Sequence, residues 1–389
     1  MEIRQIAKRY KGYVIDLRRE FHMHPEPSLK ELNTSQRIKS ELRKLNIPYT
    51  PAADTGVIAE IKGKKHGKTV ALRADIDALE INEANDIEYK SQNPGLMHAC
   101  GHDAHIASLL GAARILNDVR DNISGTIRLL FQPAEEIGKG AKALIAAGAM
   151  DGVDGVFGIH VSSNLECGKV SVDGGPLMAC ADVFKITIKG KSGHGARPHQ
   201  AIDALVAACA AVINLQTIIS REIDPLEPAV ISVGSIKSGT RFNIIANDAV
   251  LEGTSRCFGE KTRKQIFAAI ERVIKYTAQA YRAEVGIEYN FTTSPLINDA
   301  RCSEIGAGAV KKILSAKALA HVGRSLGTDD FSEYLKKSPG IYALVGVGNK
   351  TKGIIYPHHH ERFNIDEDSL EISSALYAQY ALDFLESSL

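Results

Sequence analysis

The chain has 389 residues, more than a single hydrophobic core usually organises, so two domains are expected. Its 47 Lys and Arg residues nearly balance 46 Asp and Glu residues, and this balance argues against a nucleic acid or a membrane surface as a partner. The charged N-terminal segment lacks the apolar core of a signal peptide, and no later segment is expected to span a membrane. A cytoplasmic protein is therefore expected, and in that reducing compartment six cysteines without paired spacing indicate free thiols.

Helical and strand patterns alternate over the first 180 residues. The spacing of Ile, Leu and Val predicts helices over 3–20 and 35–45. The elements expected next are strands over 69–73, 126–131 and 155–160, separated by helices over 104–117 and 140–147. Strands separated by helices predict an α/β domain with a doubly wound, mostly parallel sheet, whose ligand sites lie beyond the carboxyl ends of the strands.

The pattern changes near residue 181. Residues 182–189 alternate strictly between apolar and polar side chains, as in a half-exposed antiparallel strand. The elements expected after it are a helix (203–219), two strands (229–235 and 248–256), a helix (261–282) and a strand (285–291). This βαββαβ order predicts an inserted ferredoxin-like α+β domain.

The first domain is expected to resume after the insertion. Residues 302–314 have a helical pattern, residues 341–347 form a buried strand pattern, and residues 370–385 predict a final helix. We therefore expect one domain made of residues 1–180 and 295–389, with an inserted domain at 181–294.

Residues 97–105, Met-His-Ala-Cys-Gly-His-Asp-Ala-His, concentrate imidazole, thiol and carboxylate groups. Similar groups recur at 132–136 (Gln-Pro-Ala-Glu-Glu), at His160 and at 357–361 (Pro-His-His-His-Glu). Ligands from separate segments can approach a transition metal from different directions, which a catalytic metal centre requires. For the first window alone, a His-rich surface turn is the alternative.

Two further segments belong to the same pattern, residues 72–79 (Leu-Arg-Ala-Asp-Ile-Asp-Ala-Leu) and residues 193–199 (Gly-His-Gly-Ala-Arg-Pro-His). Taken together and in this order along the chain, all these segments resemble a known family. The family is that of metal-dependent amidohydrolases and peptidases, which includes aminoacylases, hippurate hydrolase, N-acetyldiaminopimelate deacetylase and the hydrolases of auxin amino-acid conjugates. The resemblance extends from residue 18 to residue 367. It implies a catalytic domain with an inserted lid through which two subunits form a homodimer.

The resemblance implies a site with two divalent transition-metal ions. Its expected ligands are Cys100, His102, Glu136, His160 and His359. Thiolate, imidazole and carboxylate donors suit zinc, manganese, cobalt or nickel and do not suit magnesium or calcium.

Four further residues are expected beside the metals. Glu135 is interpreted as the general base. The alternative is that Glu135 and Glu136 are a solvated acidic pair at the start of a helix. Asp75, Asp103 and His105 are expected to orient the ligands, and helix capping is the alternative for Asp103.

Three residues of the inserted domain also match family positions. The resemblance implies that His194 enters the active site of the partner subunit and hydrogen-bonds the developing oxyanion, although a glycine-flanked His alone is typical of a solvated turn. Asn243 and Arg256 match positions that face the substrate, and Arg256 could equally anchor a strand end by an ion pair.

The function implied by the resemblance is hydrolysis of the amide bond of an N-acyl amino acid or a related small conjugate by metal-activated water. The nearest alternative is a metallo-exopeptidase, a carboxypeptidase or dipeptidase, with the same centre. A non-catalytic metal-binding protein is disfavoured because neither Glu135 nor any expected ligand is missing. Departures from the family pattern at Glu80 and Asp329 leave the acyl group and the amino acid open.

Overall fold

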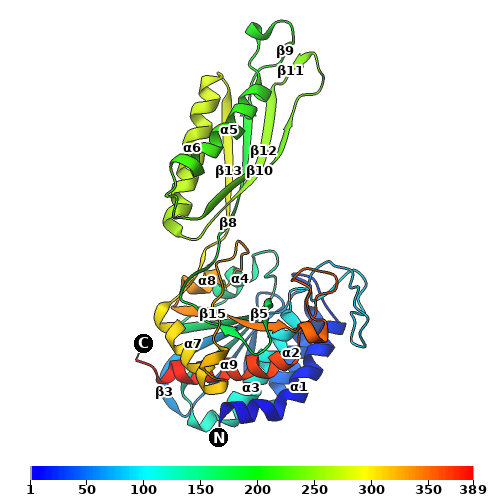
Figure 1. Cartoon of the computed structure of the whole chain (residues 1–389), viewed down its shortest axis with the longest axis vertical. Coiled ribbons are helices and arrows are strands. Elements are labelled where there is room, and N and C mark those ends of the chain that lie inside the picture. The colour runs from blue at the N-terminus through cyan, green and yellow to red at the C-terminus, as the bar shows by residue number, and fades with distance from the viewer. Residues whose placement is uncertain (1, 389) are drawn as a thin grey trace. The chain divides into compact units, whose positions relative to one another are not determined.

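The computed structural model describes residues 2–388, which form two compact units (Figure 1). Unit 1 contains the described residues up to Gly175, the segment Asn298–Gly323, and the described residues from Asp330 onward. Unit 2 contains Pro176–Ile297 and Arg324–Asp329. The chain therefore leaves unit 1, builds most of unit 2 and returns.

Unit 1 is built on a seven-stranded sheet with the order β1-β2-β4-β3-β5-β15-β6. Its strands are β1 (Tyr49–Ala52), β2 (Gly56–Lys62), β3 (Lys65–Asp75), β4 (Ser124–Gln132), β5 (Gly155–Glu166), β6 (Val170–Ser171) and β15 (Gly340–Gly348). The four central strands β4, β3, β5 and β15 run parallel, whereas β2 and β6 run antiparallel to their neighbours in this group. The expected mostly parallel sheet is confirmed, but the sequence analysis missed the antiparallel strands β1 and β2.

Helices cover both faces of this sheet. They are α1 (Ile3–Met23), α2 (Leu32–Lys44), α3 (His102–Asp118), α4 (Gly140–Ala146), α7 (Ala300–Ile313), α8 (Ser332–Leu335) and α9 (Asp368–Glu386), with short 3₁₀ turns η1 (Arg120–Asn122), η3 (Ala316–Ala318) and η4 (Lys350–Lys352). In Figure 1, α1, α3, α7 and α9 form one layer, and α4 and α8 lie on the other side of the sheet. Because helices cover both faces of the sheet, β15 is buried along almost its whole length, and its sequence is a continuous apolar run.

Unit 2 is a four-stranded antiparallel sheet with two helices packed on it. In chain order its main elements are β8 (Ala181–Lys189), α5 (Ala204–Arg221), β10 (Ala229–Ser238), β12 (Asp248–Cys257), α6 (Glu260–Ala280) and β13 (Glu284–Thr293). The sheet order β10-β12-β8-β13 with this connectivity confirms the ferredoxin-like prediction. Shorter elements are the paired strands β9 (Gly193–His194) and β11 (Ile244–Ile245), the paired strands β7 (Gly175–Met178) and β14 (Leu296–Asn298), and η2 (Pro198–Gln200).

Helix α5 corrects one expectation. By length and composition alone it is apolar enough to cross a membrane, with a mean hydropathy of 1.6, whereas no such segment was expected from the sequence. Small apolar side chains of α5, including Ala204, Ala207, Ala208 and Ala211, pack on the sheet, but only 33% of the apolar window is buried. Core helices of water-soluble proteins pass the same test, so this is weak evidence for a membrane span.

Candidate metal centre

The site is built where the central strands of unit 1 end. Asp75 is the last residue of β3, and the segment with Glu135 and Glu136 begins directly after β4. Cys100 lies just before α3, and His102 is the first residue of that helix. The carboxyl edge of a parallel sheet is where α/β folds bind ligands, because the connecting loops converge there.

One expected detail at this edge is wrong. His160 was expected to end its strand, but β5 continues to Glu166. The reason is that β15 pairs with β5 in parallel beyond His160, up to the pair Gly348 and Glu166. His160 therefore projects from the middle of an extended strand, which fixes its backbone more firmly than a loop would.

The structure brings the five expected ligands together in two groups. Cys100, His102 and His160 form one group and Cys100, Glu136 and His359 the other, and within each group the potential ligand atoms lie within 4.8 Å of one another. Cys100 Sγ is 3.4 Å from His160 Nε2, and Glu136 Oε1 is 3.8 Å from the Nε2 atoms of both His102 and His359. The Cys100 thiol is thus common to both groups of potential ligands.

Hydrogen bonds orient the imidazoles toward these groups. His102 Nδ1 donates to the carbonyl oxygen of Asp77 at 2.8 Å, and His160 Nδ1 donates to that of Val161 at 2.6 Å. With each Nδ1 carrying the proton, each Nε2 lone pair is left for a metal.

The chemistry of these donors fits transition-metal ions. His102 Nε2 and Glu136 Oε1 are buried and have no hydrogen-bond partner among the described residues. Burial raises the pKa of the Cys100 thiol well above its usual value and raises the pKa of Glu136 to about 7. Burial and the neighbouring His105 lower the pKa of His160, which keeps it neutral as a ligand must be. A bound divalent cation would stabilise the thiolate and the carboxylate that burial disfavours.

Glu135 lies beside this cluster. Its carboxylate groups with His102 and Glu136 as a further potential ligand set. The backbone N–H groups of Glu135 and Glu136 donate to the two carboxylate oxygens of the buried Asp77, each at 3.1 Å. Asp77 was overlooked in the sequence, although its spacing of two from Asp75 at a strand end could have suggested it.

The residues expected to orient the ligands have different surroundings. His105 Nδ1 donates to Asp75 at 2.6 Å, and its Nε2 accepts the backbone N–H of Val161 at 3.0 Å, so both ring nitrogens are engaged. Asp103 accepts hydrogen bonds from Arg18 at 2.8 Å and His22 at 2.7 Å, and it thereby joins α3 to α1. Gly101 occupies the N-cap position of α3, so the Asp103 carboxylate is not its N-cap.

The three residues expected in the inserted domain lie in unit 2. The backbone of His194 pairs with Ile244 across β9 and β11, and Asn243 accepts a hydrogen bond from the neighbouring Gly195. Both side chains are exposed. Arg256 donates to the backbone oxygen of Leu326 at 2.8 Å, a hydrogen bond rather than the ion pair considered as the alternative for this residue.

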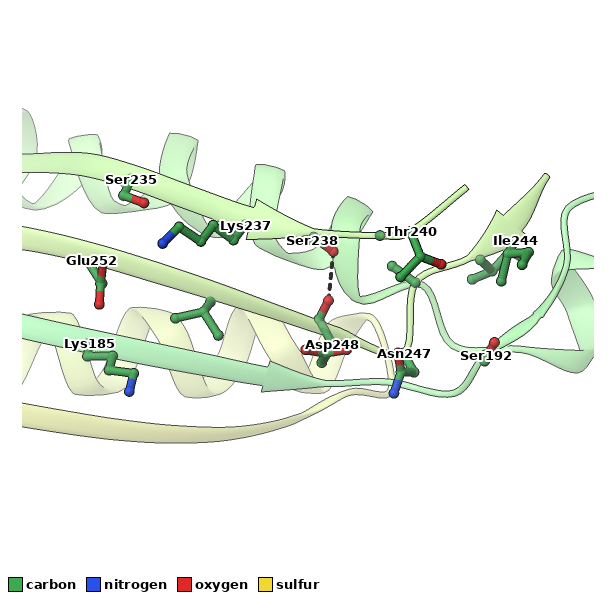
Figure 2. Close-up of a pocket in the computed structure, with 14 residues that line it drawn as sticks. Lys185, Ser192, Ser235, Lys237, Ser238, Thr240, Ile244, Asn247, Asp248 and Glu252 are labelled. Carbon is green, nitrogen blue, oxygen red and sulfur yellow. Dashed lines mark hydrogen bonds between the residues drawn. The ribbon is translucent and has the colours of Figure 1, made fainter. Parts of the chain in front are cut away.

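Unit 2 also has a pocket of about 440 Å³ that the sequence analysis did not anticipate (Figure 2). Lys185, Lys237 and Glu252 line it from neighbouring strands, and Ser238 donates to the backbone oxygen of Asp248 at its end (Figure 2). Charged side chains of both signs thus line this pocket.

Comparison with known proteins identifies the family. The model of peptidase family M20/M25/M40 matches residues 71–383. The chain belongs to this family. It is 42% identical over 389 residues to thermostable carboxypeptidase 2 of Saccharolobus solfataricus, and the match covers 98% of each chain. It is 37% identical over 382 residues to the N-acetylcysteine deacetylase of Bacillus subtilis, covering 98% of this chain and 99% of that one.

A solved structure agrees with this assignment. The crystal structure of a dinuclear metal-binding peptidase of family M20 from Bacillus subtilis is 35% identical and superposes with a TM-score of 0.87, covering 97% of this chain and 99% of that chain. The family resemblance and the fold are thus confirmed. The protein is a metal-dependent hydrolase of a family of amidohydrolases and peptidases with dinuclear metal centres.

The backbone between Cys100 and His102 gives a direct test of the site's construction. Gly101 has a φ of 89°, and a Cβ added to it would lie 2.4 Å from Val161 Cγ2. We expect Gly101→Ala to lower both the free energy of unfolding and the metal content, because the added methyl group displaces the two neighbouring ligands. Denaturant unfolding and elemental analysis measure these changes.

Gly168→Ala is the matched control. Gly168 has a similar φ of 93° with nothing within 4 Å of an added Cβ, so this variant should lose only about 1–2 kcal/mol, from the left-handed backbone, and should keep its metal. Equal losses in the two variants would show that contact with Val161 is unimportant.

Proposed function

We propose that the protein hydrolyses the amide bond of an N-acyl amino acid, or of a related small conjugate, to a carboxylate and a free amino acid. The observation that carries the proposal is the pair of ligand groups sharing Cys100, with the carboxylate of Glu135 beside them. This arrangement offers places for two ions and a separate group for proton transfer.

In this proposal Cys100, His102, Glu136, His160 and His359 hold two divalent transition-metal ions, of zinc, manganese, cobalt or nickel. When bound, such ions polarise the amide carbonyl and lower the pKa of a water molecule. The choice of metals follows from the sulfur and nitrogen donors, which magnesium and calcium do not favour.

Glu135 acts as the general base in this proposal. Its carboxylate accepts a proton from the attacking water and passes it to the leaving amine, so that one group serves both steps. The hydrogen bonds of both backbone N–H groups to Asp77 support this proposal, because they fix the peptide that carries the two carboxylates beside the ligand groups. Asp75 and His105 hold each other in place behind the ligands.

The substrate class is supported by the relatives, one of which is named for deacetylation of N-acetylcysteine. A second candidate function is exopeptidase activity, because a relative with 42% identity is named a carboxypeptidase. The same centre can cleave either bond, since both substrates present an amide carbonyl next to an amino-acid leaving group.

A substrate panel distinguishes the two candidates. With manganese, cobalt, nickel or zinc added in turn, we expect N-acetyl and N-benzoyl amino acids to be hydrolysed with a higher kcat/KM than N-blocked or free dipeptides. Release of free amino acid, followed by mass spectrometry, measures the rates. Cleavage of the dipeptides without turnover of any N-acyl amino acid would contradict the proposal and favour the exopeptidase.

The two neighbouring glutamates should respond differently to the same substitution. Glu136→Gln replaces an anionic ligand by an amide, so metal content and activity should fall together and excess metal should restore part of both. Glu135→Gln should keep the metal and lower kcat by about 10²- to 10⁴-fold, with KM little changed. Elemental analysis and steady-state kinetics measure the two effects. If Glu135→Gln is the variant that loses metal, the two roles are reversed.

We further propose that unit 2 forms a homodimer and that its His194 stabilises the oxyanion in the active site of the partner subunit, with Asn243 and Arg256 facing the substrate. An apolar exposed surface on α5 supports association: Leu205, Val206 and Ile213 are 42%, 47% and 69% exposed. Strand β10 forms an edge of its sheet, and its unpaired backbone groups are available to a second copy.

Subunit mixing tests the role of His194. His194→Ala and Glu135→Gln subunits should each be inactive alone, whereas their heterodimer should regain activity because it contains one site with both residues intact. Activity is measured after subunit exchange, with heterodimers confirmed by native mass spectrometry. Confirmed heterodimers without activity would place His194 in the site of its own subunit, and full activity of His194→Ala alone would place it outside catalysis.

A further inference from the structure

Three successive backbone N–H groups of the segment after β4 all donate to buried carboxylates. Ala134 N–H donates to Glu31 Oε1 at 2.9 Å, and the next two N–H groups donate to Asp77 as described above. Glu31 and Asp77 are both fully buried. Consecutive N–H groups that converge on anions form a rigid local structure, because each hydrogen bond restricts the same short stretch of backbone.

The segment needs such restraint because its backbone is in an unfavourable conformation. Ala134 has a φ of 52°, in the left-handed region that a residue with a Cβ rarely adopts. Its carbonyl oxygen accepts the N–H groups of Lys139 and Gly140, each at 3.2 Å, which closes the turn after the glutamates. Without an external hydrogen-bond partner, Ala134 would relax toward ordinary backbone angles and reorient Glu135 and Glu136.

Glu31 supplies this partner from a segment more than a hundred residues earlier in the chain. Its Oε1 also accepts the N–H of Leu29 at 3.0 Å, and Leu29 is itself left-handed with a φ of 67°. Its Oε2 accepts the hydroxyl of Thr55 at 2.7 Å. Oε1 of Glu31 thus joins the two left-handed turns at Leu29 and Ala134. Oε2 is held by the side chain of Thr55, which lies just before β2.

We propose that Glu31 is a positioning residue for the reaction, which acts by holding the backbone of Ala134 so that the carboxylates of Glu135 and Glu136 keep their places beside the ligand groups. The inference rests on the proposed function, in which Glu135 is the base. Glu31 touches neither substrate nor metal in this role. Its effect is exerted through the backbone of residues 134–136.

Glu26 provides a matched control in the same N-terminal segment. Its carboxylate is nearly as buried and also accepts several hydrogen bonds, from the backbone N–H groups of Asn33 and Thr34 and from both of their side chains. All of these partners belong to the first turn of α2. Glu26→Ala should therefore lower stability without changing the segment after β4.

Hydrogen–deuterium exchange of a peptide covering residues 132–140 tests the restraint directly, on metal-free and metal-loaded protein. Glu31→Ala should speed the exchange of this peptide, because the Ala134 amide loses its acceptor, whereas Glu26→Ala should not. Unchanged exchange in Glu31→Ala would overturn the proposal whatever the activity of the variant.

Kinetics at saturating metal test the consequence. Glu31→Ala should lower kcat by roughly 10- to 100-fold with a smaller change in KM, the size expected when a catalytic group is displaced by about an ångström. Glu31→Gln should stay within a few-fold of the unsubstituted enzyme, because its side-chain oxygen can still accept from Ala134 and Leu29. If Glu31→Ala does not fold, Glu31→Asp provides the same comparison, because its side chain is one methylene too short to reach the N–H of Ala134. If Glu26→Ala loses as much kcat as Glu31→Ala, Glu31 has only a structural role.

Combination with Glu135→Gln separates this inference from the proposed function. If Glu31 acts through Glu135, adding Glu31→Ala to Glu135→Gln should lower kcat little further. Normal turnover of Glu135→Gln alone would refute the assignment of the base, while the exchange experiment would still decide whether Glu31 restrains the segment. Fully additive losses would show that Glu31 acts independently of Glu135.

Discussion

Two buried carboxylates at the carboxyl end of β3 organise the centre. Asp75 holds His105, and Asp77 holds the backbone of Glu135 and Glu136. The carbonyl oxygen of Asp77 also fixes the ring of His102. Because β3 lies next to β4 in the sheet, these contacts join expected ligands from two segments, the start of α3 and the loop after β4.

Burial makes the side chains of this cluster suited to a bound cation. A thiol and a carboxyl group removed from water have raised pKa values, as at Cys100 and Glu136, and the anionic forms are stable there only beside positive charge. The imidazole of His160 is kept neutral by the same burial. The polar atoms left unpaired, His102 Nε2 and Glu136 Oε1, face this cluster, so the cost of burying them is offset when a metal binds.

Left-handed backbone conformations also occur at this site. Gly101, Ala134 and His359 have φ values of 89°, 52° and 63°, and each lies beside or within the set of ligands and base. Such conformations persist only where surrounding contacts enforce them, and they allow side chains from loops to converge at angles that regular helices and strands do not provide. The N–H of His359, which donates to the carbonyl of Ala99 at 2.9 Å, is one such contact.

The sequence by itself determined the classes of element and the chemistry of the ligands. Continuous apolar runs such as that of β15 predict strands buried on both faces, and strict alternation such as that of β8 predicts a half-exposed sheet, because these patterns are local. The types of side chain in residues 97–105 indicate a transition metal for the same reason. The antiparallel strand β2 was missed because Val57, Ile58 and Ala59 are consecutive apolar residues, so its side-chain types do not alternate as its burial does from Val57 onward.

Only the tertiary structure decided which residues meet. It placed Cys100 in both ligand groups, engaged Asp103 with Arg18 and His22, and brought Glu31 to Ala134. These contacts join residues tens to more than a hundred positions apart, so no local period encodes them. They follow from how helices and strands pack, and packing depends on the shape of the whole core rather than on the sequence near any one residue.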